Sequence, residues 1–255
     1  MIRSITLLLT FLSCAVSAKD ITATAWLVAS ADGDIIDSVN MHEERSIASI
    51  TKLMTAMIVL DAKQDLDEKL KPLTRRELLQ LAIVHSDNNA SERLCQNYPG
   101  GRSKCINAMN AKAKSLGMLH TGFSDPTGLG NTNRSTAYDL VKLVQAAHLY
   151  PEIVSASKMS AVKIERTVKI KTKTKTKKNN SKIKTKYLVY RNTNPLVATK
   201  DFIVSKTGYI RASGGCIVMM IDTDFGRRIV VLLNSKNTKT RIPEAYGLAT
   251  SGFNL

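Results

Sequence analysis

The chain has 255 residues and carries 37 lysine and arginine side chains against 21 aspartates and glutamates, a formal net charge of +16. Its length supports one substantial hydrophobic core or two interlocked lobes. The spacing of the four histidines is not that of metal ligands: they are His42, His85, His120 and His148. We therefore expect no metal site and no cofactor.

Residues 1–18 have the features of a secretory signal peptide. A positive charge at Arg3 precedes an apolar stretch over residues 5–16, and small residues follow it up to Ala18. We expect cleavage after Ala18, which leaves a single domain over residues 19–255. No later apolar run approaches the roughly twenty residues that a membrane span needs. The sequence thus predicts a soluble protein exported to the periplasm.

The cysteines are consistent with export. Cys14 lies in the leader in a poor context for lipid attachment, so a lipoprotein is the less favoured alternative. Cys95 and Cys105 flank a Pro-Gly-Gly turn that would bring two helix ends together, and the sequence leaves open whether they form a disulfide. Cys216 lies in the apolar run CIVMMI, which predicts a buried free thiol.

Secondary-structure patterns place strands at both ends of the chain and helices between them. We expect two strands joined by an Asp-Gly turn over residues 21–40 and three more from residue 201 onward. Helical patterns cover 45–62, 74–96 with a polar interruption at 86–89, 100–116, 135–147 and 151–155. The sequence predicts an α+β fold, in which both chain ends form an antiparallel sheet and a helical lobe is inserted at about 48–160.

Much of the positive charge lies in residues 163–190, where lysine alternates with threonine or isoleucine around an Asn-rich turn at 178–180. Alternation with period two predicts a protruding lysine-rich hairpin. Two interpretations stay open: a solvated hairpin without a specific ligand, or an electrostatic contact with an anionic envelope surface, either cell-wall polymer or lipid. Aromatic residues are too sparse here for base stacking, so we expect no nucleic-acid partner.

Ser49 and Lys52 lie three residues apart near the start of a predicted helix, so their side chains share one face. If burial lowers the pKa of the amine, Lys52 can accept the serine proton, and free backbone N–H groups at the helix start can stabilise an oxyanion. The spacing alone is weak evidence, because it recurs at Ser155/Lys158, Ser160/Lys163 and Ser181/Lys184.

Two further motifs make the pattern specific. The triplet SDN, residues 86–88, interrupts a helical region, and KTG, residues 206–208, occurs once, on a predicted strand followed by glycine-rich chain. A serine nucleophile with a lysine base, followed in order by these two triplets, is typical of penicillin-recognising enzymes.

At these motifs the chain resembles the penicillin-recognising serine acyltransferases, most closely the low-molecular-mass penicillin-binding proteins of the D-alanyl-D-alanine carboxypeptidase and endopeptidase family. The resemblance covers most of residues 20–235, and includes the segments HSDNNASERL, YPGG, DPTGL, STAYDLVKLV and SKTGY. The residues in and around AMNAKAKSLGM and NTN resemble the branch of soluble periplasmic murein endopeptidases. The resemblance implies a beta-lactamase/transpeptidase-like fold.

By this resemblance, Ser49 attacks a D-alanyl carbonyl and Lys52 accepts its proton. Ser86 relays a proton to the leaving amine, while Asn88 positions Lys52 and the substrate backbone. Water then hydrolyses the acyl-enzyme. Beta-lactams, which mimic the D-Ala-D-Ala end, are expected to acylate Ser49 as covalent inhibitors.

The resemblance also implies a binding strand. Lys206 and Thr207 would bind the substrate carboxylate, and Gly208 would let the strand approach the peptide. The backbone N–H groups of Ser49 and Tyr209 would form the oxyanion hole. Substrates would be peptidoglycan peptides, and we expect a monomer.

Four functions stay open. The leading one is an endopeptidase that cleaves D-alanyl cross-links, because no amphipathic anchor follows the final SGFNL. The alternatives are a D-Ala-D-Ala carboxypeptidase, a non-catalytic peptidoglycan-binding protein and, ranked low, a serine beta-lactamase, since no glutamate has the usual setting for fast deacylation.

Two features depart from the family pattern. The spacing from Ser49 to Ser86 is shorter than the resemblance implies, as if a segment between KLKPL and TRREL were missing. The lysine-rich hairpin is more basic than the family pattern suggests.

Arg241 is a candidate for binding a substrate carboxylate, although a surface arginine at the start of the last helix is the preferred interpretation.

Overall fold

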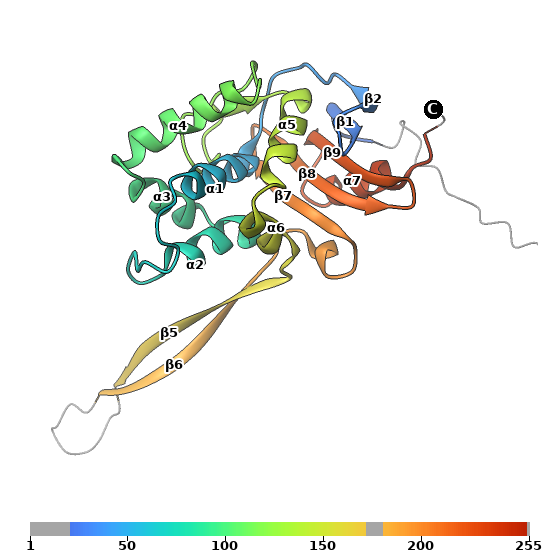
Figure 1. The fold of residues 1–255 in the computed structure, drawn as a ribbon. Coiled ribbons are helices and arrows are strands. Elements are labelled where there is room, and N and C mark those ends of the chain that lie inside the picture. The colour runs from blue at the N-terminus through green and yellow to red at the C-terminus, as the bar shows by residue number, and fades with distance from the viewer. Residues whose placement is uncertain (1–20, 172–180, 254–255) are drawn as a thin grey trace, which may run out of the picture.

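The computed structural model of the protein describes residues 21–171 and 181–253. The expected signal peptide and the predicted Asn-rich turn at 178–180 lie outside the described residues. The chain folds into a sheet that is covered by helices, with a long two-stranded hairpin extending from the helical side (Figure 1).

The sheet consists of both chain ends, as expected. Its strand order is β2-β1-β9-β8-β7, and every neighbouring pair is antiparallel. The first strand pairs with the second-to-last element of the chain, with Trp26 opposite Leu232. The prediction of an α+β fold with an antiparallel sheet from both termini is therefore confirmed. The strands are β1 (Ala25–Ser30), β2 (Ile35–Val39), β3 (Arg45–Ser46), β4 (Arg134–Ser135), β5 (Ala161–Lys171), β6 (Ser181–Arg191), β7 (Phe202–Ile210), β8 (Gly214–Thr223) and β9 (Gly226–Ser235).

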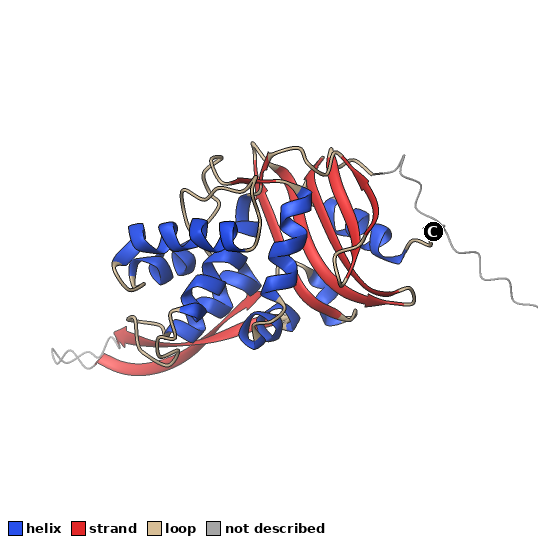
Figure 2. Cartoon of the chain, turned by 45° about the horizontal axis from the view of Figure 1, so that its top comes forward, coloured by secondary structure: helices blue, strands red, loops and turns tan. Residues whose placement is uncertain are grey.

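The helices occupy most of the middle of the chain and its last segment. Figure 2 shows them packed beside the strands of the sheet. They are η2 (Ala48–Ile50), α1 (Thr51–Asp61), α2 (Arg75–Gln80), η3 (Leu81–His85), α3 (Asn88–Gln96), α4 (Gly101–Ser115), α5 (Ala137–Ala147), α6 (Pro151–Lys158), η4 (Pro195–Ala198) and α7 (Arg241–Thr250). None of the helices in the described ranges is both long and apolar enough to cross a bilayer.

The sheet separates two hydrophobic cores, because successive side chains of a strand point to opposite faces. Leu27 and Val231 belong to the larger core, which the helical lobe covers. Trp26 and Leu232 belong to the smaller core, which α7 covers. Helix α1 is buried from Thr51 to Val59 inside the helical lobe, so packing fixes the end of the helix that follows Ser49.

A disulfide joins Cys95 at the end of α3 to Cys105 in α4, with 5.4 Å between the Cα atoms. The turn at Pro99-Gly100-Gly101 thus connects two cross-linked helices, which answers the question that the sequence left open. Cys216 is a buried free thiol in β8, as predicted.

The helix expected to start at residue 45 starts later. Arg45 and Ser46 instead form β3, which pairs with β4. Ala48 then has a left-handed backbone with φ of 45°, and a 3-10 turn leads into α1 at Thr51. A left-handed residue cannot continue a right-handed helix, so the regular helix begins only beyond it.

Candidate active site

Ser49 lies in the 3-10 turn η2, immediately before the buried helix α1. It lines a cleft of about 250 Å³ between the helical lobe and the edge of the sheet. The cleft contains most of the predicted site residues: Ser49, Ser86, Asn88, Thr207, Gly208 and Tyr209. The structure therefore brings together residues from three segments that are far apart in the sequence.

Lys52 lies beneath the serine, fully buried one turn into the helix. Its Nζ atom is 2.7 Å from Oγ of Ser49, 2.8 Å from Oδ1 of Asn88 and 2.6 Å from the carbonyl oxygen of Thr127. A neutral amine has two N–H donors and one lone pair. When Asn88 and Thr127 accept both donors, the lone pair is left to face the hydroxyl of Ser49.

Burial lowers the pKa of Lys52 from its usual 10.5 to about 7. The carboxylates of Asp125 and Asp87 act in the opposite direction, since a nearby negative charge favours the ammonium form. Desolvation is the larger effect. At neutral pH a substantial fraction of Lys52 is consequently free to accept a proton.

The SDN triplet lies where one helix ends and the next begins. The π-helical turn η3 ends at Ser86, whose backbone is left-handed with φ of 59°. The Asp87 side chain then accepts a hydrogen bond from the backbone of Ala90, which caps α3 and makes Asn88 its first residue. A left-handed serine at a helix junction is a strained arrangement of the kind often found at functional sites.

Lys206 is buried under this triplet, on strand β7. Its Nζ donates to Oγ of Ser86 at 2.8 Å and to the carbonyl of Thr207 at 2.8 Å. Burial, followed by the positive charges of Lys52 and Arg241, holds the pKa of Lys206 well below its usual value. Because Lys206 is only 1% exposed, its side chain contacts Ser86 and the backbone of Thr207 inside the site.

Strand β7 forms the free edge of the sheet beside Ser49. The backbone N–H of Ile210 turns inward to Ser213, so the N–H of the preceding residue, Tyr209, faces the open side. A Cβ atom on Gly208 would lie 3.0 Å from the backbone nitrogen of Ser49. Glycine is therefore what lets this strand approach the nucleophile closely.

Three residues that sequence reasoning did not assign lie in the loop DPTGL. The carbonyl of Thr127 accepts from Lys52, and Asp125 holds the loop by accepting from the backbone of Thr127 and Gly128. Gly128 has φ of 73°, and a Cβ there would lie 1.8 Å from the carbonyl oxygen of Ala48. In the sequence, only the presence of the segment DPTGL pointed to this loop, because the group that accepts from Lys52 is a backbone carbonyl.

The preference for Arg241 as a surface residue is wrong. The side chain is only 8% exposed and donates from NH1 to the carbonyl of Gly208 at 2.6 Å. It lines the cleft together with Thr193, whose hydroxyl accepts from that of Thr207 at 2.7 Å. Arg241 is buried because α7 packs against β8 and β9, which brings this side chain next to Gly208 of the edge strand, a long-range arrangement that a local helix-start pattern does not report.

Residues 13–72 and 68–237 match the protein family described as D-alanyl-D-alanine carboxypeptidase. The chain belongs to this family. It is 37% identical over 228 residues to a D-alanyl-D-alanine endopeptidase of Escherichia coli. The aligned region covers 81% of this chain and 66% of that protein. The corresponding Pseudomonas aeruginosa endopeptidase is 36% identical over 238 residues, or 85% of this chain and 72% of that one.

The fold of this family member is also found among solved structures. A point mutant of a DD-transpeptidase from Streptomyces superimposes with a TM-score of 0.75 and 26% identity, covering 90% of this chain and 98% of that chain. The beta-lactamase/transpeptidase-like fold expected from the resemblance is thereby confirmed. The two matched segments of the family overlap at residues 68–72, just before the boundary between KLKPL and TRREL where the missing segment is expected.

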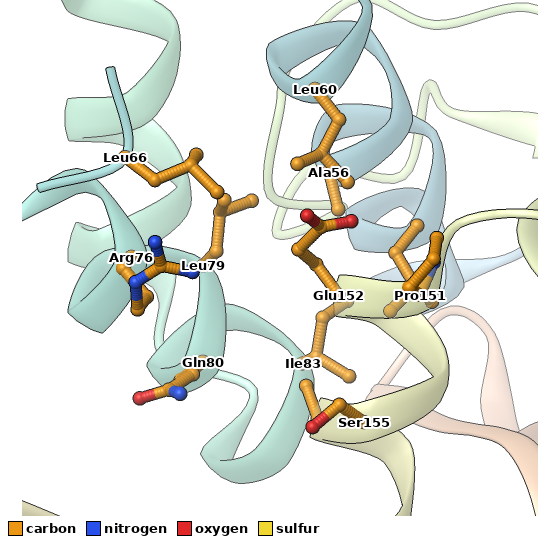
Figure 3. A pocket seen from close by; sticks show the side chains of 12 residues that line it. Ala56, Leu60, Leu66, Arg76, Leu79, Gln80, Ile83, Pro151, Glu152 and Ser155 are labelled. Carbon is orange, nitrogen blue, oxygen red and sulfur yellow. The ribbon is translucent and has the colours of Figure 1, made fainter. Parts of the chain in front are cut away.

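A separate pocket of about 240 Å³ lies beside this shortened region, at the far end of α1 from Ser49 (Figure 3). Leu60, Leu66 and Leu79 line it, and Arg76 and Glu152 lie on opposite sides of it. It shares no lining residue with the cleft. The pocket is therefore a hollow distinct from the cleft at Ser49.

Proposed function

We propose that this protein is a serine D-alanyl-D-alanine endopeptidase that cleaves D-alanyl cross-links in peptidoglycan. The observation that carries the proposal is the 2.7 Å separation between Nζ of Lys52 and Oγ of Ser49 at the floor of a cleft beside a free strand edge. The endopeptidase names of the two relatives support the choice of a cross-link over a free D-Ala-D-Ala end.

Acylation begins when Oγ of Ser49 attacks the D-alanyl carbonyl and its proton passes to Lys52. The backbone N–H groups of Ser49 and Tyr209 stabilise the oxyanion. As the C–N bond breaks, the leaving amine takes a proton through Ser86, which Lys206 positions at 2.8 Å. Water then attacks the ester, gives its proton back through the same bases and releases the acid.

Substrate recognition uses the edge strand and the positive charges beyond it. Peptide backbone adds to β7 as a further strand, a common mode of peptide binding. The carboxylate next to the scissile bond lies between the hydroxyl of Thr207 and the guanidinium of Arg241. Penicillins have a carboxylate in the corresponding position, so they acylate Ser49 and hydrolyse slowly.

The test combines covalent labelling with turnover. Intact mass is measured after penicillin is added to the mature protein and to Ser49→Ala, and purified cross-linked muropeptide dimers are then digested. One adduct on the wild type, none on the variant, and conversion of dimers to monomers support the proposal. Release of D-alanine from pentapeptides with intact dimers would instead identify a carboxypeptidase, and an adduct without turnover would identify a binding protein.

We also propose export to the periplasm. The signal-peptide features of residues 1–18 support it, as does the disulfide between Cys95 and Cys105, since disulfides persist in oxidising compartments. The mass of the protein from a periplasmic extract should correspond to a chain that begins at Lys19. Full-length protein in the cytosolic fraction alone would contradict export.

The hairpin β5–β6 supports a contact with the anionic cell wall. It extends from the body (Figure 1), and its register places Arg166 opposite Lys186, both exposed. Charge reversal of this pair, Arg166→Glu with Lys186→Glu, should weaken cosedimentation with purified sacculi. The control reverses Lys104 and Lys114 on α4, which changes the net charge equally. Equal binding of the two double variants would exclude a role for the hairpin.

A further inference from the structure

The cleft at Ser49 opens into a second, larger groove. The groove has a volume of about 680 Å³ and shares two wall residues, Thr193 and Arg241, with the cleft. Leu196 lines it on the side of η4, and Ile242 and Tyr246 line it on the side of α7. A molecule bound at Ser49 can therefore continue past Arg241 without leaving the surface of the protein.

Arg241 gives a second reason to expect a ligand at this junction. The residue as a whole is 8% exposed, and Nη1 donates to the carbonyl of Gly208. Its Nε atom is also buried and has no hydrogen-bond partner among the residues that the structure describes. A buried donor without a partner costs free energy unless a ligand or water satisfies it.

We infer that this groove binds the leaving peptide of a cross-link, the stem peptide whose amine is released when Ser49 is acylated. The inference rests on the proposed function and extends it. The carboxylate next to the scissile bond lies between Thr207 and Arg241 in that proposal. The remaining atoms of the same residue must then exit at these two side chains, which is where the groove begins.

The size and chemistry of the groove fit such a peptide. A carboxypeptidase releases a single D-alanine, which the cleft of about 250 Å³ accommodates without a further groove. A cross-link instead releases a whole stem peptide, with methylene chains and free carboxylates. The walls offer apolar contact at Leu196 and Ile242, and the exposed Lys239 on the rim offers a positive charge.

The experiment compares two substrates on the mature enzyme. Steady-state kcat/KM is measured for a cross-linked muropeptide dimer and for a monomeric pentapeptide, whose leaving group is one D-alanine. Thr238→Trp narrows the groove at an exposed wall position, and Lys239→Glu reverses the charge of its rim. The controls are Lys236→Trp and Lys236→Glu, at an exposed lysine three residues away that does not line the groove.

Both groove variants should lower the dimer-to-pentapeptide ratio of kcat/KM at least about fivefold, mainly through KM, because they weaken binding of the leaving peptide. The two Lys236 variants should keep the wild-type ratio. A wild type that cleaves dimers, with groove variants that keep its ratio, overturns the inference and leaves the proposed function standing. A wild type that cleaves only pentapeptides overturns both.

Discussion

Nζ of Lys52 lies 2.7 Å from the hydroxyl of Ser49 and 2.8 Å from the side-chain oxygen of Asn88, so one buried amine joins the start of α1 to the start of α3. The same contacts explain why a lysine is tolerated in the buried part of this helix. Its head group is surrounded by acceptors, while burial removes its charge over part of the neutral pH range. A structural requirement and a chemical one are met by the same side chain.

Acylation by penicillin should rise with pH and level off above about 7. The pKa of Lys52 is lowered to about 7 by burial, so the amine is protonated and inactive as a base below that value and neutral above it. The second-order acylation rate, followed by intact mass from acid to alkaline pH, should show this single inflection. Lys52→Arg, which cannot deprotonate, should lose roughly 10²- to 10⁴-fold on the plateau above pH 7 and show no such inflection. A flat profile for the wild type would contradict Lys52 as the base.

Replacing Asn88 by aspartate should move that inflection to higher pH. The substitution keeps the shape of the side chain but places a negative charge beside Nζ of Lys52, which stabilises the ammonium form and raises its pKa. Acylation at neutral pH should therefore fall and recover in alkaline solution. Asn97→Asp, at the exposed end of the same helix, adds the same charge far from the amine and should leave the profile unchanged. A fall without alkaline recovery would show that Asn88 acts in some other way.

Gly128→Ala should impair both stability and acylation. A Cβ at this position would lie 1.8 Å from the carbonyl oxygen of Ala48, so the loop must move away from the backbone that carries Ser49. Gly226→Ala is the matched control, since it also has a positive φ, of 89°, but meets no atom within 4 Å. The control should lose about 1 kcal/mol of unfolding free energy from backbone strain alone and acylate normally. Equal effects of the two variants on acylation would exclude the loop as a support for Ser49.

Part of the chemistry of this site could be predicted from the sequence. The i, i+3 spacing predicted that the side chains of Ser49 and Lys52 share one face, because adjacent turns of a helix keep their local geometry. The resemblance to the family implied that the two later triplets join them. The strands at the chain ends predicted the sheet, since alternating apolar residues need a common core.

The remaining parts depend on contacts between distant segments. The carbonyl of Thr127 accepts from Lys52, and a backbone carbonyl has no residue signature. The left-handed Ala48 comes directly after β3, whose partner β4 lies far along the chain, with Ser46 opposite Arg134. Arg241 is buried by the packing of α7 on β8 and β9. Local periodicity contains none of this information, so these features could be found only in the folded chain.

Removing the disulfide should destabilise the helical lobe and leave the chemistry intact. The bridge closes a loop of 10 residues between α3 and α4, and chain entropy predicts a loss of about 3 kcal/mol for the double variant Cys95→Ala/Cys105→Ala. Asn88 lies at the opposite end of α3, so acylation measured well below the unfolding temperature should stay close to that of the wild type.

Urea unfolding with and without a thiol reductant distinguishes the stability that comes from the disulfide bond from the stability that comes from the packing of its sulfur atoms. The reductant should lower the wild-type midpoint toward that of the double variant and leave the variant itself unchanged. Cys216→Ala removes a buried thiol that forms no bridge, so its midpoint should fall by less and the reductant should still lower it further. A wild-type midpoint that does not respond to reductant under unfolding conditions would mean that the bridge contributes no stability, because the unfolded chain exposes it to reduction.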